Sequence, residues 1–190
     1  TFNRPEFKRM IQDIENKKGK RATNYLDEFD YLITSGIALE VKAVSNPVFP
    51  LSQSSKKNLL KLYLNDVGLL TNILYKNNIN AILGDEKSIN LGSVYESVVA
   101  SELIAHGYEL YYYDNKSKGE VDFLIDDHNS LCVVPLEVKS GKDYTVHSAL
   151  SNMLSNGDYN VKKGFVLSNA REIFTKNNII YIPIYFIMFM

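Results

Sequence analysis

Hydrophobic positions in the first part of the chain recur at helical spacing and then alternate. Apolar residues every three or four positions predict three helices, at residues 5–19, 22–35 and 66–76. Residues 37–44 and 60–65 have the β-rich or alternating pattern of strands. The stretch 45–58 between them contains two prolines and four serines, so it is predicted as a loop.

The order of these elements predicts a module that precedes the rest of the chain. Helix, helix, strand, loop and strand follow one another as in a winged-helix-like α+β module, which we place at residues 1–76. Such modules bind DNA in many proteins, and in others they bind protein partners. Residues 77–90 are polar and are predicted as a partly helical connector.

A second unit is predicted at residues 91–190. It begins with a strong helix at 91–106, and a shorter helix is predicted at about 144–155. Runs rich in Val, Ile, Tyr and Phe predict five strands, at residues 109–114, 120–126, 131–140, 163–167 and 179–184. Strands that alternate with helices in this way predict an α/β domain with a sheet flanked by helices.

Composition and charge narrow the class of protein. The 190 residues are 45% hydrophobic and 23% charged, which excludes a disordered chain. The net charge of −1 points to no particular partner, although residues 1–21 carry an excess of positive charge that suits either a solvated helix face or phosphate contacts. The single cysteine, Cys132, excludes an internal disulfide and fits a reducing cytosol. We therefore expect a cytoplasmic protein.

The ends of the sequence lead to two further expectations. The longest apolar run, residues 179–190, is shorter than a membrane helix and contains Pro183, so no membrane partner is expected. The chain begins at Thr1 in sequence predicted as helical, which suggests a piece of a longer protein. It contains no G-x-x-x-x-G-K-[ST] phosphate loop, so this chain alone is not expected to be a P-loop ATPase.

Two strand segments carry the candidate chemistry. Asp122 lies within an apolar strand, and Glu137 and Lys139 share one face of the next strand because side chains alternate. If the strands pair as a hairpin, Asp122 comes beside Glu137, and a divalent cation would relieve the repulsion between the two carboxylates. Carboxylates with water suit Mg²⁺ or Mn²⁺, and Lys139 would face the same ion. The pattern predicts phosphodiester hydrolysis, although solvated charges on the outer face of a hairpin would give the same pattern.

The pattern Asp–x₁₄–Glu–x–Lys resembles that of the PD-(D/E)XK nuclease superfamily. Members also place a glutamate on the first helix, where Glu96 stands in this chain. The resemblance implies that Asp122 and Glu137 are the metal ligands, that Lys139 positions the attacking water, and that Glu96 orients the metal shell. It also implies a restriction-endonuclease-like mixed sheet for the second unit and DNA as the substrate.

A longer resemblance extends over most of the chain. It rests on seven ordered segments, at residues 22–26, 33–37, 45–47, 50–52, 61–70, 95–103 and 120–123. Together they resemble the C-terminal half of a family of prokaryotic AAA+ ATPases. In that family an ATPase module precedes a winged-helix segment and a domain of uncharacterised function with a restriction-endonuclease-like core. The resemblance implies an ATPase module as a partner within the intact protein.

Several alternatives stay open at this point. The chain is either a metal-dependent DNA nuclease, or a catalytically silent nuclease-like module that binds nucleic acid or protein, or a scaffold for ATPase assembly. Glu102 falls within the predicted apolar stripe of the helix 91–106, so it is expected to be a buried carboxylate with a structural partner or a member of the site. The run of tyrosines at 111–113 suits a half-buried strand or a stacking surface for bases. The histidines have no zinc spacing, and His147 is expected at the surface.

Overall fold

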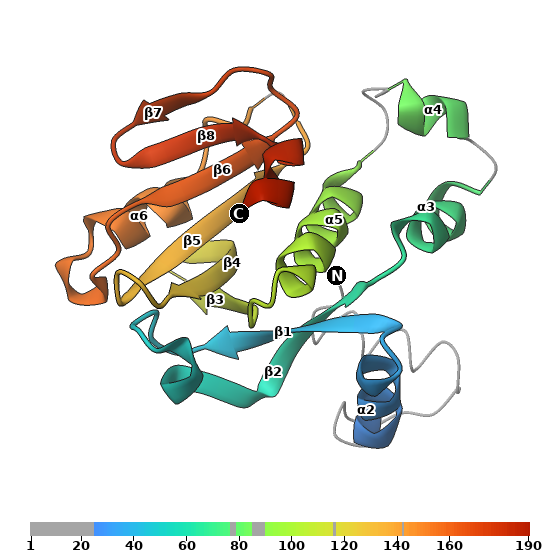
Figure 1. The fold of residues 1–190 in the computed structure, drawn as a ribbon, viewed down its shortest axis with the longest axis horizontal. Helices are drawn as coiled ribbons and strands as arrows, with labels where there is room; N and C mark the ends of the chain where they lie inside the picture. Colours follow the sequence, from blue (N-terminus) through green and yellow to red (C-terminus); the bar gives the residue numbers. More distant parts are fainter. Residues whose placement is uncertain (1–24, 77–78, 85–89, 116, 142) are drawn as a thin grey trace.

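The computed structural model describes residues 25–76, 79–84, 90–115, 117–141 and 143–190 (Figure 1). The helix predicted at 5–19 and the first residues of the one at 22–35 lie outside these ranges. The strands are β1 (Ala38–Val44), β2 (Ser55–Leu64), β3 (Tyr111–Asn115), β4 (Gly119–Asp127), β5 (Cys132–Lys139), β6 (Gly164–Ser168), β7 (Phe174–Lys176) and β8 (Ile179–Pro183).

All eight strands belong to one mixed sheet, in the order β2-β1-β3-β4-β5-β6-β8-β7. β1 is antiparallel to β2 but parallel to β3, which follows it after the helical segments. The hairpin β1–β2 and the strands after residue 91 therefore share one sheet. The α/β class predicted from the sequence is confirmed. The boundary between modules at residue 76 stays a prediction, and the sheet is continuous across it.

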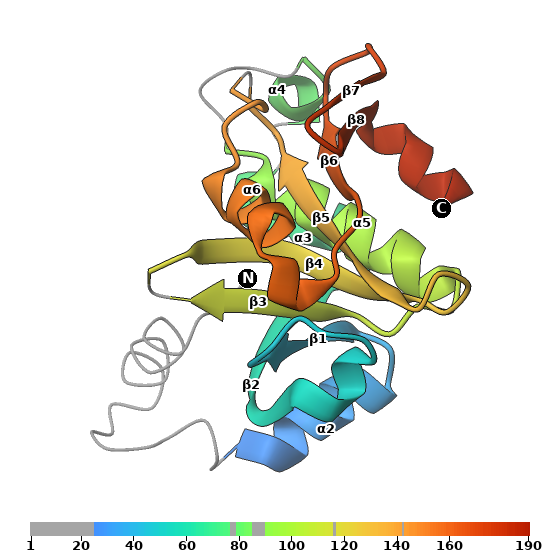
Figure 2. The same cartoon turned by 90° about the vertical axis from the view of Figure 1, so that its left-hand side faces the viewer.

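The helices lie on both faces of this sheet. They are α2 (Leu26–Thr34), α3 (Val67–Tyr75), α4 (Ile79–Leu83), α5 (Gly92–Ala105) and α6 (Ser148–Ser155), with short 3₁₀ turns η2 (Leu51–Ser54), η3 (Gly157–Tyr159) and η4 (Ile184–Phe189). Figure 2 shows α6 on one side of the central strands and α5 on the other. α3 begins at a capping side chain, because Asp66 Oδ1 accepts from the Leu69 N–H. At the start of α5, Asn90 Oδ1 accepts from the Gly92 N–H, while the N-cap residue Leu91 has no side-chain cap.

Each face of the sheet has its own hydrophobic core. On the α5 side, Val99 and Leu103 pack with Phe123 and Leu136, and all four are fully buried. On the α6 side, the fully buried or nearly buried members include Val121, Leu124, Val133 and Met153. The tyrosines at 111–113 are buried, so they contribute to these cores and are not an exposed stacking surface.

Most of the predicted elements after residue 60 are confirmed within a few residues. β2 begins at Ser55, which shortens the predicted loop 45–58, because its polar start pairs with the end of β1. α6 begins at Ser148 and not at about residue 144. β7 was not predicted, since Phe174–Lys176 is too short to show an alternating pattern.

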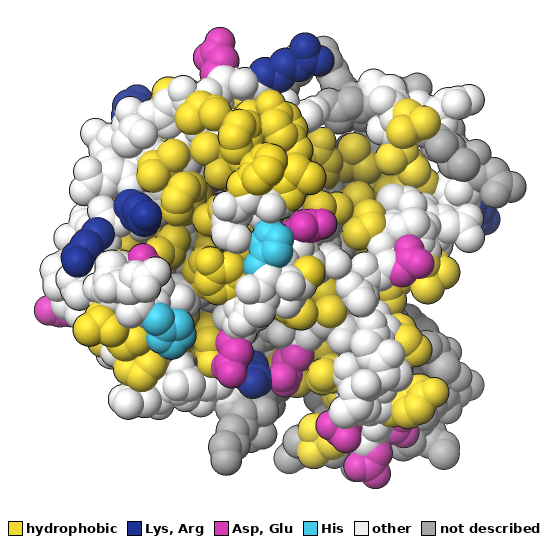
Figure 3. All heavy atoms as spheres, in the orientation of Figure 1, with side chains coloured by type: hydrophobic (Ala, Val, Ile, Leu, Met, Phe, Trp, Pro, Cys, Tyr) yellow, Lys and Arg dark blue, Asp and Glu magenta, His cyan; other side chains and the backbone are white. Residues whose placement is uncertain are grey.

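The apolar run at residues 179–190 forms β8 and then η4, which packs on α5. In the described part of the chain, no helix has the length and apolar character needed to cross a membrane. η4 leaves Tyr185, Met188 and Phe189 more than half exposed, and Figure 3 shows hydrophobic side chains gathered over this C-terminal segment.

The buried face of α5 is rotated about the helix axis from the predicted apolar stripe, which included Glu102. Val94, Ser97 and Leu103 are buried toward the sheet, and Ser97 supplies a small side chain where the helix approaches the strands. Glu102 therefore points away, with 43% of its side chain exposed, and its Oε2 lies 4.0 Å from His106 Nε2 one turn later. The expectation that Glu102 is buried is wrong.

Close packing of α6 on β4 depends on Gly119. Its φ of +88° is strained for other residues, and an added Cβ would lie 3.0 Å from Ala149 Cβ. We expect Gly119→Ala to lower the free energy of unfolding by about 1–2 kcal/mol in a denaturant titration. Gly157→Ala, where an added Cβ meets no atom within 4 Å, is the matched control and should change it little.

Candidate functional site

The hairpin of β4 and β5 sets the position of the candidate acids. Its antiparallel register runs from Asp127↔Cys132 to Phe123↔Leu136, as predicted from the two strand segments. Asp122 and Glu137 are the next residues on each strand. The turn at the other end is held by Asp127, whose carboxylate accepts from Asn129 N–H and from the Ser130 hydroxyl.

A bulge in β4 changes the direction of Asp122. Tyr111 pairs with Leu124 and Tyr113 with Val121, so two residues of β4, Asp122 and Phe123, stand opposite the single intervening residue of β3. Such a bulge twists the strand and re-aims the side chains at that point. Figure 2 shows β5 turning away from β4 toward β6 and β8.

The Asp122 carboxylate occupies the place where the two strands separate. Its Oδ2 accepts a hydrogen bond of 2.8 Å from the backbone N–H of Val138. The Asp122 side chain thus accepts the hydrogen bond of a β5 amide that lies beyond Phe123↔Leu136, the last pair of the β4–β5 ladder. Part of Asp122 keeps contact with solvent, but many protein atoms surround its carboxylate. The bond fixes Asp122 beside the strand that carries Glu137 and Lys139.

Glu137 is the most deeply buried acid of the group, with 5% of the residue exposed. Its Oε1 accepts a hydrogen bond of 2.7 Å from Lys139 Nζ, two residues along the strand. Its Oε2 is buried and has no hydrogen-bond partner among the described residues. A buried carboxylate oxygen without a partner is costly, so this atom is the strongest sign of an additional ligand.

Glu96 reaches the group from α5. Its Oε2 accepts a hydrogen bond of 2.8 Å from the hydroxyl of Tyr63 on β2. The negative charge of Glu96 raises the pKa of both Asp122 and Lys139, which places it within electrostatic range of the two strands. The structure thus brings together the four residues singled out in the sequence.

The electrostatics of the group are those of crowded acids. Burial raises the pKa of Asp122 well above its usual range, and the charges of Glu137 and Glu96 raise it further. The N–H of Val138 and the charge of Lys61 oppose this shift. Burial likewise raises the pKa of Glu137, against the lowering effect of its hydrogen bond with Lys139.

Lys139 stays a cation in this environment. Burial alone would lower its pKa, but its hydrogen bond with Glu137 and the charges of Glu137, Asp122 and Glu96 outweigh burial, so the pKa of Lys139 is raised overall. An ammonium group of this kind donates hydrogen bonds and balances negative charge. It does not accept a proton near neutral pH.

Three residues beside the group were not predicted from the sequence: Lys61, Tyr63 and Glu120. The side chain of Lys61 on β2 is only 9% exposed and forms an ion pair with Glu120 of β4. Its Nζ lies 4.7 Å from the centre of the Tyr112 ring. The alternation of leucines at 60, 62 and 64 does place Lys61 and Tyr63 on one face of β2. No local pattern says that this face meets α5 and β4.

The charges around the site favour a cation. Four carboxylates and two ammonium groups interact there, and they belong to Glu96, Glu120, Asp122, Glu137, Lys61 and Lys139. With all six groups ionised, the excess is two negative charges, and Glu137 Oε2 has no hydrogen-bond partner among the described residues. Both features fit a divalent ion. In the part of the chain that the structure describes, no three His, Cys, Asp or Glu side chains form a metal cage. A cation here would therefore have two carboxylates and several waters, as Mg²⁺ accepts.

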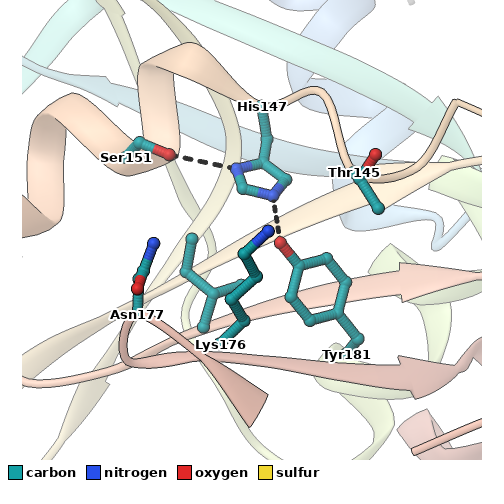
Figure 4. A pocket seen from close by; sticks show the side chains of 7 residues that line it. Thr145, His147, Ser151, Lys176, Asn177 and Tyr181 are labelled. Carbon is teal, nitrogen blue, oxygen red and sulfur yellow. Dashed lines mark hydrogen bonds between the residues drawn. The ribbon is translucent and has the colours of Figure 1, made fainter. Parts of the chain in front are cut away.

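A shallow pocket of about 200 Å³ lies on the α6 side (Figure 4). His147, the N-cap residue of α6, is one of its lining residues, with Nδ1 3.2 Å from Ser151 Oγ and Nε2 hydrogen-bonded to the Tyr181 hydroxyl. His147 was predicted at the surface, and its side chain is only partly buried. Its charge lowers the pKa of Glu137, so the pocket is close enough to the acids to influence them.

Fold and site together define a mixed α/β protein with a cluster of acids and lysines where β4 and β5 part. The chain belongs to the family described as a domain of unknown function, DUF4143, whose model matches residues 91–187. This segment begins at α5 and ends within η4, so it contains Glu96, Asp122, Glu137 and Lys139 and excludes β2. No curated protein and no solved structure matches the chain.

Proposed function

We propose that residues 91–190 form a PD-(D/E)XK-like nuclease domain that hydrolyses phosphodiester bonds of DNA with Mg²⁺ or Mn²⁺. The observation that carries the proposal is the buried Glu137 Oε2, which has no hydrogen-bond partner in the part of the chain that the structure describes and lies among several acids. The restriction-endonuclease-like character of the sheet, the choice of DNA and the link to an ATPase module come from the resemblances in the sequence. They belong to the same proposal.

The residues have distinct roles in this proposal. Asp122 and Glu137 hold the cation, and Glu96 orients its water shell. The bound cation would supply positive charge to a phosphate oxygen and would lower the pKa of a coordinated water. In hydrolysis a water oxygen bonds to phosphorus, the bond to the leaving oxygen breaks, the attacking water gives up a proton to solvent water, and the leaving oxygen takes up a proton from solvent water. Lys139, as a cation, donates hydrogen bonds to the water or to the phosphate and balances the charge that develops there.

One observation favours the alternative of a silent module. Lys139 is paired with Glu137, and Asp122 is bonded to Val138, so both groups already have partners within the protein. A nuclease-like domain that binds nucleic acid or protein and regulates the ATPase without cutting would keep this arrangement as structure.

Cleavage of supercoiled plasmid tests the two candidates. We expect the purified chain to nick or cut DNA with Mg²⁺ or Mn²⁺, and we expect cleavage to stop when the metal is chelated. Asp122→Ala should abolish cleavage, because it removes a metal ligand. The exposed Asp114 on β3 provides the control, since Asp114→Ala should retain activity. DNA that is bound but not cut would favour the silent module. Cleavage that survives Asp122→Ala would remove the site from the mechanism.

A further inference from the structure

Two residues of β2 face the site from outside the matched family segment. β2 packs against α5, and its Tyr63 is 2% exposed, with its ring 5.5 Å from that of Phe123 on β4. Lys61, two residues earlier on the same face, pairs with Glu120 of β4. This face of β2 therefore lies between the helix that carries Glu96 and the strand that carries Asp122.

The contact with Glu96 is direct and well defined. The Tyr63 hydroxyl donates to Glu96 Oε2 over 2.8 Å, and the tyrosine ring is fixed by burial in the core on the α5 side. A rigid donor restricts the rotamers of a glutamate, whose long side chain otherwise samples many orientations. A hydrogen bond to a charged group is also stronger than one between neutral groups. Tyr63 can therefore determine where the Glu96 carboxylate lies.

We propose that Tyr63 is a positioning residue that holds Glu96 for the cation, so that the site includes β2 as well as the segment 91–187. This inference rests on the proposed function, because it assigns a role in cation binding to a residue of the same site. Tyr63 touches Glu96 and does not act on substrate. Its removal should weaken cation binding more than the rate at saturating cation.

The test compares Tyr63→Phe with Tyr111→Phe in the whole chain. Tyr111 is equally buried, and its hydroxyl donates to Glu109 Oε2 over 2.6 Å, so the control also removes a tyrosine–glutamate bond. We expect Tyr63→Phe to raise the dissociation constant for Mn²⁺ about threefold to tenfold in calorimetry, as the loss of one hydrogen bond to a charged group permits. The Mn²⁺ concentration for half-maximal cleavage should rise equally, with the rate at saturation within about twofold, and Tyr111→Phe should change neither value.

A double-mutant cycle separates positioning from a general structural role. If Tyr63 acts through Glu96, Tyr63→Phe should have no further effect on Mn²⁺ binding in a Glu96→Gln background. Equal effects in both backgrounds, or no effect in the natural one, would overturn the inference while the proposed function stands. A natural chain that neither binds Mn²⁺ nor cuts DNA would overturn both. Thermal unfolding of each variant checks that the fold is retained.

Discussion

Lys139→Met is expected to slow DNA cleavage about 100- to 1000-fold at saturating Mg²⁺, the effect typical of losing one group that stabilises transition-state charge. Methionine keeps the length of the side chain but removes the ammonium, whose raised pKa keeps it charged. The Glu137 carboxylate that this ammonium contacts remains, so cation binding should persist. Single-turnover cleavage measured alongside Mn²⁺ binding distinguishes the two properties.

The control for this change is Lys162→Met, at an exposed position after α6. It removes the same charge from the chain and should leave the cleavage rate unchanged. A rate within tenfold of the natural chain for Lys139→Met would contradict a direct role of the ammonium. Lost Mn²⁺ binding would instead make Lys139 part of the structure that holds Glu137.

Asp122→Asn is expected to make the cation-free protein more stable at neutral pH, because the substitution removes a buried charge that neighbouring acids repel. The pKa of Asp122 is raised in the folded state by burial and by neighbouring acids, so an ionised Asp122 opposes folding. Asparagine carries no charge, and its side-chain oxygen can still accept from the Val138 N–H. Chemical unfolding with and without Mg²⁺ measures the effect.

The pH dependence of this effect has a definite sign. A group with a raised folded-state pKa contributes stability that is complete below its unfolded value and is lost as pH rises through the folded-state value. The advantage of Asp122→Asn should therefore be absent below about pH 4 and should grow as the pH rises. If Asp122 is a ligand of the proposed cation, Mg²⁺ should stabilise the natural chain and not the variant, because a ligand stabilises only the form that binds it. A variant less stable than the natural chain at neutral pH would show that the Asp122 charge supports the fold.

The sequence predicted well those features that depend on local pattern. The helix at 91–106 and the strands that carry Asp122 and Glu137 have the periodicity of their elements, and the structure places them within a few residues. The β4–β5 hairpin could be expected because these two strands are separated only by a short polar turn. Glu96, Asp122, Glu137 and Lys139 could be picked out because charges within apolar strands and at the start of a helix are conspicuous.

The features that depend on distant contacts were not predictable in this way. The bulge at Asp122 arises from pairing with β3, and only that pairing shows two residues opposite one. The buried face of α5 was predicted incorrectly because Ser97 is polar yet faces the sheet, while Glu102 is only partly buried. Lys61 and Tyr63 went unnoticed because their partners lie on α5 and β4, tens of residues away.

The parallel pairing of β1 with β3 also bears on how fragments of this protein would behave. A chain cut at the start of the family segment would lose both β1 and β2 and leave bare the edge of β3 that pairs with β1. Its free N–H and C=O groups, next to newly uncovered apolar side chains, would offer a template for self-association. We therefore expect a fragment that retains β1 and β2 to self-associate less through this edge than a fragment that begins at residue 91.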